Sequence, residues 1–191
     1  MTKHRVRTAV VAFAAFAALP LGLFAMAPAA HAASATYEGK VTTSSLNVRS
    51  APTSAAGKVG SLKKGAKITI QCKVFGPSVS GNSLWYKLGT GRWVTARYVA
   101  NVGSAPRFCG TGKEYQGKVV STSSLNIRSG PNTANAKVSS ASRGQTLWAV
   151  CKVDSQSIGG NKRWYQLTSD GGGQWVSARY VSNVGSAPPY C

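Results

Sequence analysis

The chain contains a long internal repeat. Residues 93–109, WVTARYVANVGSAPRFC, return as residues 175–191, WVSARYVSNVGSAPPYC, with 13 of 17 positions identical. Further upstream, SSLNVRSAP from Ser44 matches SSLNIRSGP from Ser123. The offset is 79 residues over most of the match and becomes 82 after three extra residues in the glycine-rich segment before Trp175. A period of this length is typical of a small domain rather than of a solenoid repeat.

The first residues have the order of a secretory signal peptide. Three basic residues among the first seven precede an apolar run over residues 9–26, and Ala30-His31-Ala32 follows that run. A membrane anchor is the alternative, but Pro20 interrupts the run and small residues close it. We therefore expect cleavage after Ala32 and a secreted product without a transmembrane anchor.

Composition makes the expected mature chain short and strongly basic. Removal of residues 1–32 leaves 159 residues, with 20 of the 23 Lys and Arg residues against 4 acids and a formal charge of +16. Two domains of about 75 residues fit this length, and cores of that size are only marginally stable by burial alone. Some further constraint on the unfolded chain is therefore expected.

The four cysteines supply such a constraint. Each copy has its own pair at matching positions, which favours Cys72 with Cys109 and Cys151 with Cys191 over the other pairings. In the chain-entropy model, closing loops of about 40 residues is worth about 4 kcal/mol each. A metal site is the alternative, but the wide spacing has no CxxC pair and no histidine partner. We expect one disulfide in each copy and no metal.

Apolar residues alternate with polar ones over short segments, which predicts an all-β chain. In the clearest segment, every second residue from Ala66 to Val74 is apolar or cysteine, so one face is expected to be core and the other wet. Clusters of Gly, Pro, Ser and Asn separate the segments, and none shows sustained helical periodicity. The expected domains are residues 33–109 and 115–191, joined by a linker at residues 110–114.

Four motifs recur in the same order in both copies: LN(V/I)RSxP, a turn that ends in Gly, a WY strand and WVxARYV. In this order they resemble the bacterial SH3 domain family across nearly the whole expected mature chain, twice. The resemblance implies two tandem, small SH3-like barrels. It also implies an exported protein of a kind that commonly binds cell-wall peptidoglycan. The paired cysteines and the NVGSAP tail are not part of the general family pattern.

Residues suited to catalysis are scarce. Both histidines, His4 and His31, lie in the predicted signal segment, so no histidine base is expected in the mature chain. Glycoside hydrolysis normally needs two positioned carboxylates, and no acid pair recurs in the two copies. The acids are Glu38, Glu114, Asp154 and Asp170. We expect a protein that is not an enzyme and needs no cofactor.

The expected function is binding of cell-wall peptidoglycan or of an associated anionic, teichoic-acid-like polymer. A mature charge of +16 would attract such a polymer over a Debye length, although solubility alone is an alternative explanation of the charge. The alternative function is an interaction module, an inhibitor or adaptor, that acts on another exported protein. Nucleic acid is a further possible ligand of basic strands with aromatics, but export makes it an unlikely partner.

The candidate ligand-contact residues are pairs at equal positions of the two copies. Arg49 and Arg128 follow the LN(V/I) strand, where a guanidinium can pair with a carboxylate or phosphate or can anchor the next turn. Tyr98 and Tyr180 match the groove tyrosine of the resembled family, with packing of the closing turn as the alternative.

Tryptophans complete the candidate set. Strand alternation places Tyr86 on the core side with Leu88, so Trp85 is expected to point outward, and Trp164 likewise in the second copy. The alternative is that the loop beginning at Gly76 or Ser155 folds over each ring. Trp148 is expected to point outward in the second copy only, where the first copy has Thr69.

Overall fold

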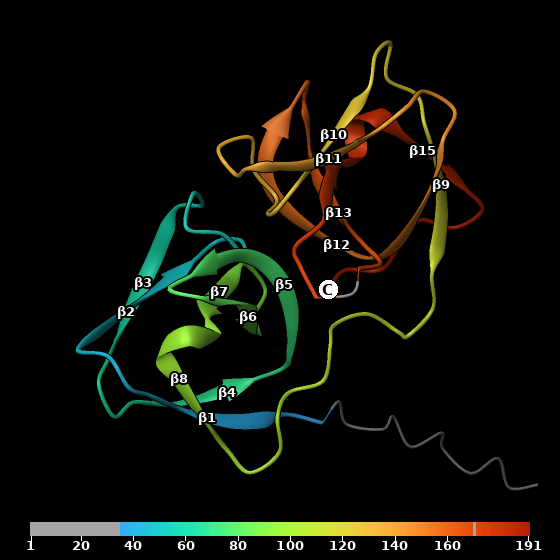
Figure 1. Cartoon of the computed structure of the whole chain (residues 1–191). Helices are drawn as coiled ribbons and strands as arrows, with labels where there is room; N and C mark the ends of the chain where they lie inside the picture. The colour runs from blue at the N-terminus through green and yellow to red at the C-terminus, as the bar shows by residue number, and fades with distance from the viewer. Residues whose placement is uncertain (1–34, 170) are drawn as a thin grey trace, which may run out of the picture. The chain divides into compact units, whose positions relative to one another are not determined.

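The computed structural model describes residues 35–169 and 171–191, and the predicted signal peptide lies outside these ranges. Strands dominate, which confirms the all-β prediction (Figure 1). Within the described ranges, no helix is long and apolar enough to cross a membrane. Residues Ser34–Cys191 form one compact unit. The predicted boundaries between the copies and at the linker remain a prediction.

Each copy folds into strands of similar order, with one short 3-10 turn before the last strand. In the first copy these are β1 Tyr37–Val41, β2 Ser45–Arg49, β3 Lys58–Lys63, β4 Lys67–Ile70, β5 Cys72–Val79, β6 Asn82–Gly89, β7 Arg92–Thr95, η1 Ala96–Tyr98 and β8 Val99–Val102. In the second they are β9 Tyr115–Val119, β10 Leu125–Arg128, β11 Lys137–Ala141, β12 Thr146–Ile158, β13 Asn161–Leu167, β14 Trp175–Ser177, η2 Ala178–Tyr180 and β15 Val181–Val184.

The strands of each copy pair antiparallel in one topology. The first copy has sheets of order β4-β1-β8 and β3-β2-β7-β6-β5, and the second has one sheet of order β11-β10-β14-β13-β12-β9-β15. The two orders correspond, because β12 is continuous where the first copy breaks between β4 and β5 at Gln71. A register shift between Ala149 and Cys151 marks the same bend in β12. Bending one strand into two sheets closes each copy into a small barrel, as predicted.

Each barrel has its own apolar core, filled by the alternating residues of its strands. In the first copy it is Val41, Leu46, Val48, Ile68, Ile70, Tyr86, Val94 and Ala96. In the second it is Val119, Leu125, Ile127, Ala141, Leu147, Ala149, Tyr165, Leu167, Val176 and Ala178. The space inside is tight: a Cβ added to Gly39 would lie 2.6 Å from Val99 Cγ1, and one added to Gly117 would lie 2.4 Å from Val181 Cγ1. Glycine at this position therefore lets the first strand of each barrel approach the last.

A third buried cluster contains residues of both copies: Cys72, Val74, Trp85, Trp93, Cys109, Cys151, Val153, Trp164, Trp175 and Cys191. Hydrogen bonds reinforce it. The indole N–H of Trp175 donates to the carbonyl of Phe75 at 2.8 Å, and the Thr53 hydroxyl donates to the Asn135 side-chain oxygen at 2.8 Å. The prediction of one common core face from Ala66 to Val74 is thus partly wrong, since Cys72 and Val74 pack in this third cluster while Ile68 and Ile70 pack in the barrel.

Both disulfides pair as predicted, Cys72 with Cys109 and Cys151 with Cys191, each with 5.0 Å between the Cα atoms. They attach the tail of each copy to its bent strand. Lys73 and Lys152 each form a parallel bridge with the residue before the tail cysteine, Phe108 or Tyr190. The NVGSAP tail therefore runs back to the barrel and contributes its cysteine to the third cluster.

Candidate functional site

A groove of about 330 Å³ opens in the second copy. It is lined by the hydroxyl-rich segment before β10, by residues of β10 and η2, and by Trp164 of β13. The lining residues are Ser121, Thr122, Ser123, Ser124, Leu125, Asn126, Arg128, Thr133, Ile158, Trp164, Ser177 and Tyr180. Three predicted contact residues, Arg128, Trp164 and Tyr180, thus come together in one place.

Tyr180 ends the 3-10 turn η2. The Ser177 hydroxyl accepts a hydrogen bond from the backbone N–H of Arg179 at 3.3 Å, which caps the turn. The turn buries Ala178 and leaves Tyr180 38% exposed. An exposed aromatic ring on a rigid turn offers a flat apolar face beside a hydroxyl, which suits contact with a sugar or peptide.

The two arginines anchor the turns that follow them, which was the structural alternative. Arg128 Nη1 donates to the Asn135 carbonyl at 2.9 Å, and Arg49 Nη1 donates to the Ala56 carbonyl at 2.7 Å. One of five N–H donors is used in each of these bonds. Arg128 also lines the groove, so its guanidinium is held in a defined place beside the other lining groups.

The predicted outward exposure of Trp85 and Trp164 is wrong, because each ring is only 2% exposed. Alternation itself holds, since Tyr86 and Tyr165 pack in the barrel cores and the tryptophans point to the opposite face. That face is covered. The indole N–H of Trp85 donates to the Pro77 carbonyl at 3.0 Å and that of Trp164 donates to the Gln156 carbonyl at 2.8 Å. The segments that begin at Gly76 and Ser155 therefore cover the rings, as the ends of strands β5 and β12 rather than as loops.

Trp148 belongs to a different surface of the second copy. It is 47% exposed on β12, opposite Gln116 of β9, and Gln116 in turn pairs with Val184 of β15, which is 45% exposed. The predicted outward orientation is confirmed. In the first copy the same row is Thr69, Glu38 and Val102.

The first copy arranges its corresponding tyrosine differently. The Tyr98 hydroxyl lies 3.2 Å from Ser80 Oγ, within hydrogen-bond distance, and the ring is half-buried. Arg49 and Trp85 form the same hydrogen bonds as Arg128 and Trp164 of the second copy.

The run of hydroxyl residues that lines the groove was not among the predicted contact residues, although a Thr/Ser run precedes the LN(V/I)R motif in both copies.

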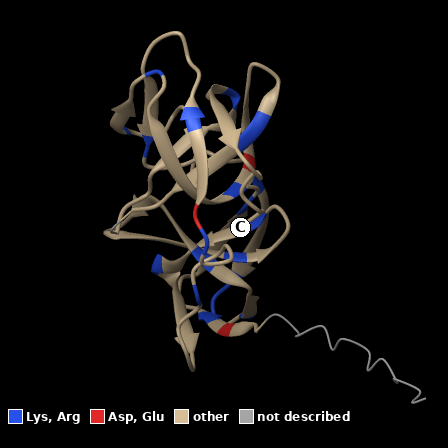
Figure 2. Ribbon diagram, turned by 90° about the vertical axis from the view of Figure 1, so that its right-hand side faces the viewer, with Lys and Arg blue, Asp and Glu red and all other residues tan. Residues whose placement is uncertain are grey.

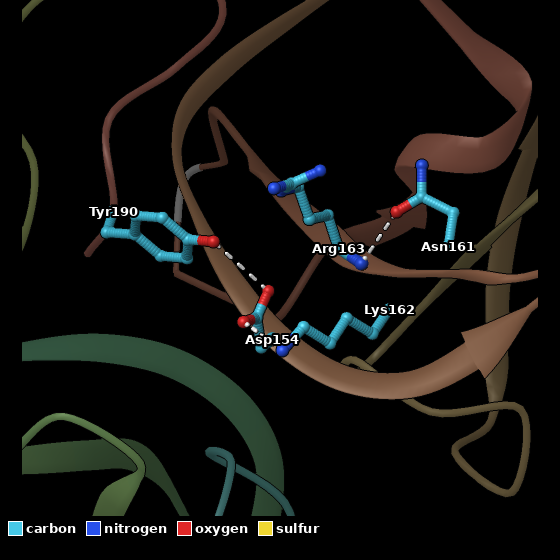
Figure 3. Close-up of polar contacts among 5 residues, drawn as sticks. All are labelled: Asp154, Asn161, Lys162, Arg163 and Tyr190. Atoms are coloured by element: carbon cyan, nitrogen blue, oxygen red, sulfur yellow. Dashed lines mark hydrogen bonds and ion pairs between the residues drawn. The ribbon is translucent and has the colours of Figure 1, made fainter.

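Each carboxylate that the structure describes has a polar or basic partner. Glu38 lies 3.4 Å from Lys67 Nζ, and Glu114 accepts from the Thr168 hydroxyl at 3.1 Å. Asp154 lies 3.1 Å from Lys162 Nζ and accepts from the Tyr190 hydroxyl at 3.3 Å (Figure 3). Tyr190 also raises the pKa of the Arg163 guanidinium, through a side-chain hydrogen bond between the two residues. None of the residues that line the groove is acidic, so these three carboxylates lie outside it.

Basic residues are spread over the strands and loops, with few acidic stretches between them (Figure 2). In the first copy, Lys40 of β1 lies directly opposite Lys67 of β4, and both side chains are exposed. Like charges in such a pair repel one another, and the ion pair between Lys67 and Glu38 offsets part of that repulsion.

Comparison with protein families finds the Bacterial SH3 domain at residues 44–100 and again at 123–182, together more than half of the chain. Among curated proteins, none matches the chain. Solved structures similar to it include NlpC2 from Trichomonas vaginalis, at 11% identity and a TM-score of 0.29, with 78% of this chain and 49% of that chain covered. NlpC1 from the same organism has a TM-score of 0.28 at 11% identity, with 79% and 47% covered.

A third similar structure is the endolysin LysPBC5 CBD, at 11% identity and a TM-score of 0.29, with 79% of this chain and 95% of that chain covered. The chain spans about half the length of the two NlpC structures.

Proposed function

Because the chain belongs to the bacterial SH3 domain family, we propose that it is an exported, non-enzymatic protein that binds cell-wall peptidoglycan through the groove of its second copy. The observation that supports this most is the chemistry of the groove. Its lining combines four consecutive hydroxyl residues, an amide, one arginine and an exposed tyrosine, and none of its members is acidic.

These groups match the chemistry of a glycan substituted with short peptides. Serine and threonine hydroxyls and the Asn126 amide both donate and accept hydrogen bonds, as sugar hydroxyls and peptide groups do. The ring of Tyr180 offers an apolar face for a sugar or a side chain. Arg128 can pair with a peptide carboxylate through N–H groups that do not hold the Asn135 carbonyl.

The positive charge supports attraction to the wall at longer range. A formal charge of +19 for the whole chain, or +16 without residues 1–32, favours approach to phosphate and carboxylate polymers. An anionic, teichoic-acid-like polymer is therefore a second wall ligand in this proposal, bound through exposed lysines rather than through the groove.

A second candidate function is docking to another exported protein. It is favoured by the row of Trp148, Gln116 and Val184, in which the two apolar side chains, Trp148 and Val184, are exposed to water. Substitution of Trp148 by threonine, the residue of the first copy, separates the two functions, because this row lies outside the groove.

The test is a pull-down of residues 33–191 on purified cell walls, with anionic beads as the control surface. We expect Tyr180→Ala to weaken wall binding at least about tenfold, or about 1.4 kcal/mol. The matched control is Tyr190→Ala, because Tyr190 is exposed but lies outside the groove. Equal retention on walls and beads, or equal losses in the two variants, would contradict the proposal. A loss caused by Trp148→Thr and absent in Tyr180→Ala would favour the other surface.

A further inference from the structure

The two copies differ in the hairpin that follows Ile158, one of the residues that line the groove. Ser80 and Gly159 occupy the same place in the hairpin before β6 and β13, and both have left-handed backbones, with φ of 47° and 53°. Glycine adopts this conformation without steric cost, whereas for other residues it costs about 1–2 kcal/mol. The first copy therefore keeps a side chain where the backbone disfavours one.

That side chain reaches the groove tyrosine. Ser80 Oγ lies 3.2 Å from the Tyr98 hydroxyl, within hydrogen-bond distance. Gly159 has no side chain that can reach Tyr180. A Cβ at Gly159 would instead lie 3.1 Å from Nε of Arg179, so glycine leaves room there for the arginine beside the groove.

The opposite wall also differs. In the second copy, the backbone N–H and the hydroxyl of Thr133 both donate to Gln156 Oε1, at 2.7 and 2.8 Å. These bonds hold the loop after β10 against β12, and Thr133 lines the groove. The first copy has Ser54 and Pro77 at these positions, and a proline side chain offers no acceptor. The first copy therefore lacks this pair of hydrogen bonds.

We propose that the wall ligand is bound by the groove of the second copy alone, and that in the first copy the Ser80–Tyr98 hydrogen bond closes the corresponding groove. This inference rests on the proposed function. It makes each chain monovalent for the groove ligand, despite the tandem repeat. Ser80 and Gly159 are then the positions that set which copy binds.

The binding test compares single variants of residues 33–191 on purified walls. We expect Tyr180→Ala to lose at least about tenfold in affinity and Tyr98→Ala to stay within about twofold of the unmodified protein. Ser80→Gly placed in the Tyr180→Ala protein should recover at least about threefold of the lost affinity, because it opens the first groove. Equal losses from the two tyrosine variants, or no recovery from Ser80→Gly, would overturn the inference.

A second measurement tests the closure without any ligand. Nitration by tetranitromethane, mapped by mass spectrometry, should modify Tyr180 faster than Tyr98. The Ser80→Gly change should raise the rate of Tyr98 nitration at least about threefold. Equal rates for the two tyrosines, or an unchanged Tyr98 in Ser80→Gly, would overturn the closure. If the unmodified protein binds walls no better than anionic beads, the proposed function fails, while the nitration result still decides whether the first groove is closed.

Discussion

At the scale of single residues, the tryptophans divide into structural and exposed positions. Trp85 and Trp164 are buried at equal positions of the two copies and donate their indole N–H groups to carbonyls of β5 and β12. Trp148 has no counterpart in the first copy and is exposed. Trp164 lines the groove with a ring that is only 2% exposed, so an effect of its substitution on ligand binding would be mixed with its effect on folding.

We expect Trp85→Ala to lower the free energy of unfolding by about 3–5 kcal/mol, because it empties a buried site and leaves the Pro77 carbonyl without its donor. Trp148→Thr should change it by no more than about 0.5 kcal/mol, since the ring is exposed and threonine suits a strand. Urea unfolding followed by circular dichroism measures both. Similar unfolding midpoints for the two variants would show that the Trp85 ring is not part of the packed interior.

At the scale of elements, strand alternation decides which way each side chain points, and neighbouring segments decide what covers it. Strand β6 buries an aromatic ring on each face, with Tyr86 in the barrel and Trp85 beneath the end of β5. Strand β5 passes so close that a Cβ added to Gly76 would lie 2.7 Å from both the Pro52 carbonyl oxygen and Trp85 Cδ1. The second copy has Ser155, in β12, at this position.

Exchanging glycine and serine between these two positions tests how closely β5 and β12 pack over the tryptophans. Gly76→Ser should destabilise the protein by about 1–3 kcal/mol, because the new side chain must displace backbone and indole atoms. The reverse change in the second copy, Ser155→Gly, removes atoms and should cost about 1 kcal/mol or less. Thermal unfolding of both variants supplies the comparison. A Gly76→Ser protein with the same melting temperature as the unmodified protein would contradict the close approach of this segment to Trp85.

At the scale of the whole molecule, the copies differ in charge as well as in groove shape. Residues 33–109 contain 11 Lys and Arg against one acid, and residues 115–191 contain 8 against two. Part of the difference lies at the turn before the bent strand, where Lys63 and Lys67 of the first copy correspond to Ser142 and Thr146. The first copy is therefore the more basic of the two copies, and the groove proposed to bind the ligand lies in the second.

Salt should separate the two contributions to wall binding. Raising ionic strength from about 0.01 M to about 0.15 M shortens the Debye length from about 30 Å to about 8 Å, which screens exposed lysines. We expect binding in the wall pull-down to weaken and then to level off, because hydrogen bonds and ring contacts in the groove are screened less. A complete loss of binding at about 0.15 M would indicate that charge alone holds the protein on the wall.

Much of this architecture follows from the sequence by itself. The repeat, the alternation of apolar residues and the matching cysteines predict two all-β units, each closed by its own disulfide, because these are local or pairwise patterns. The 3-10 turns at Ala96–Tyr98 and Ala178–Tyr180 also follow from a short segment, since their caps at Thr95 and Ser177 are adjacent in the chain.

Tertiary structure alone decided what lies beyond each strand face. Alternation predicts that Trp85 points away from Tyr86, but the burial of Trp85 depends on the end of β5 and on a cluster shared with residues 66 to 106 positions away. In the same way, identical motifs contain Tyr98 and Tyr180, but only the tertiary structure brings Ser80, 18 residues before Tyr98, within hydrogen-bond distance of the Tyr98 hydroxyl. Such contacts depend on the positions of distant backbone segments, which periodicity does not describe.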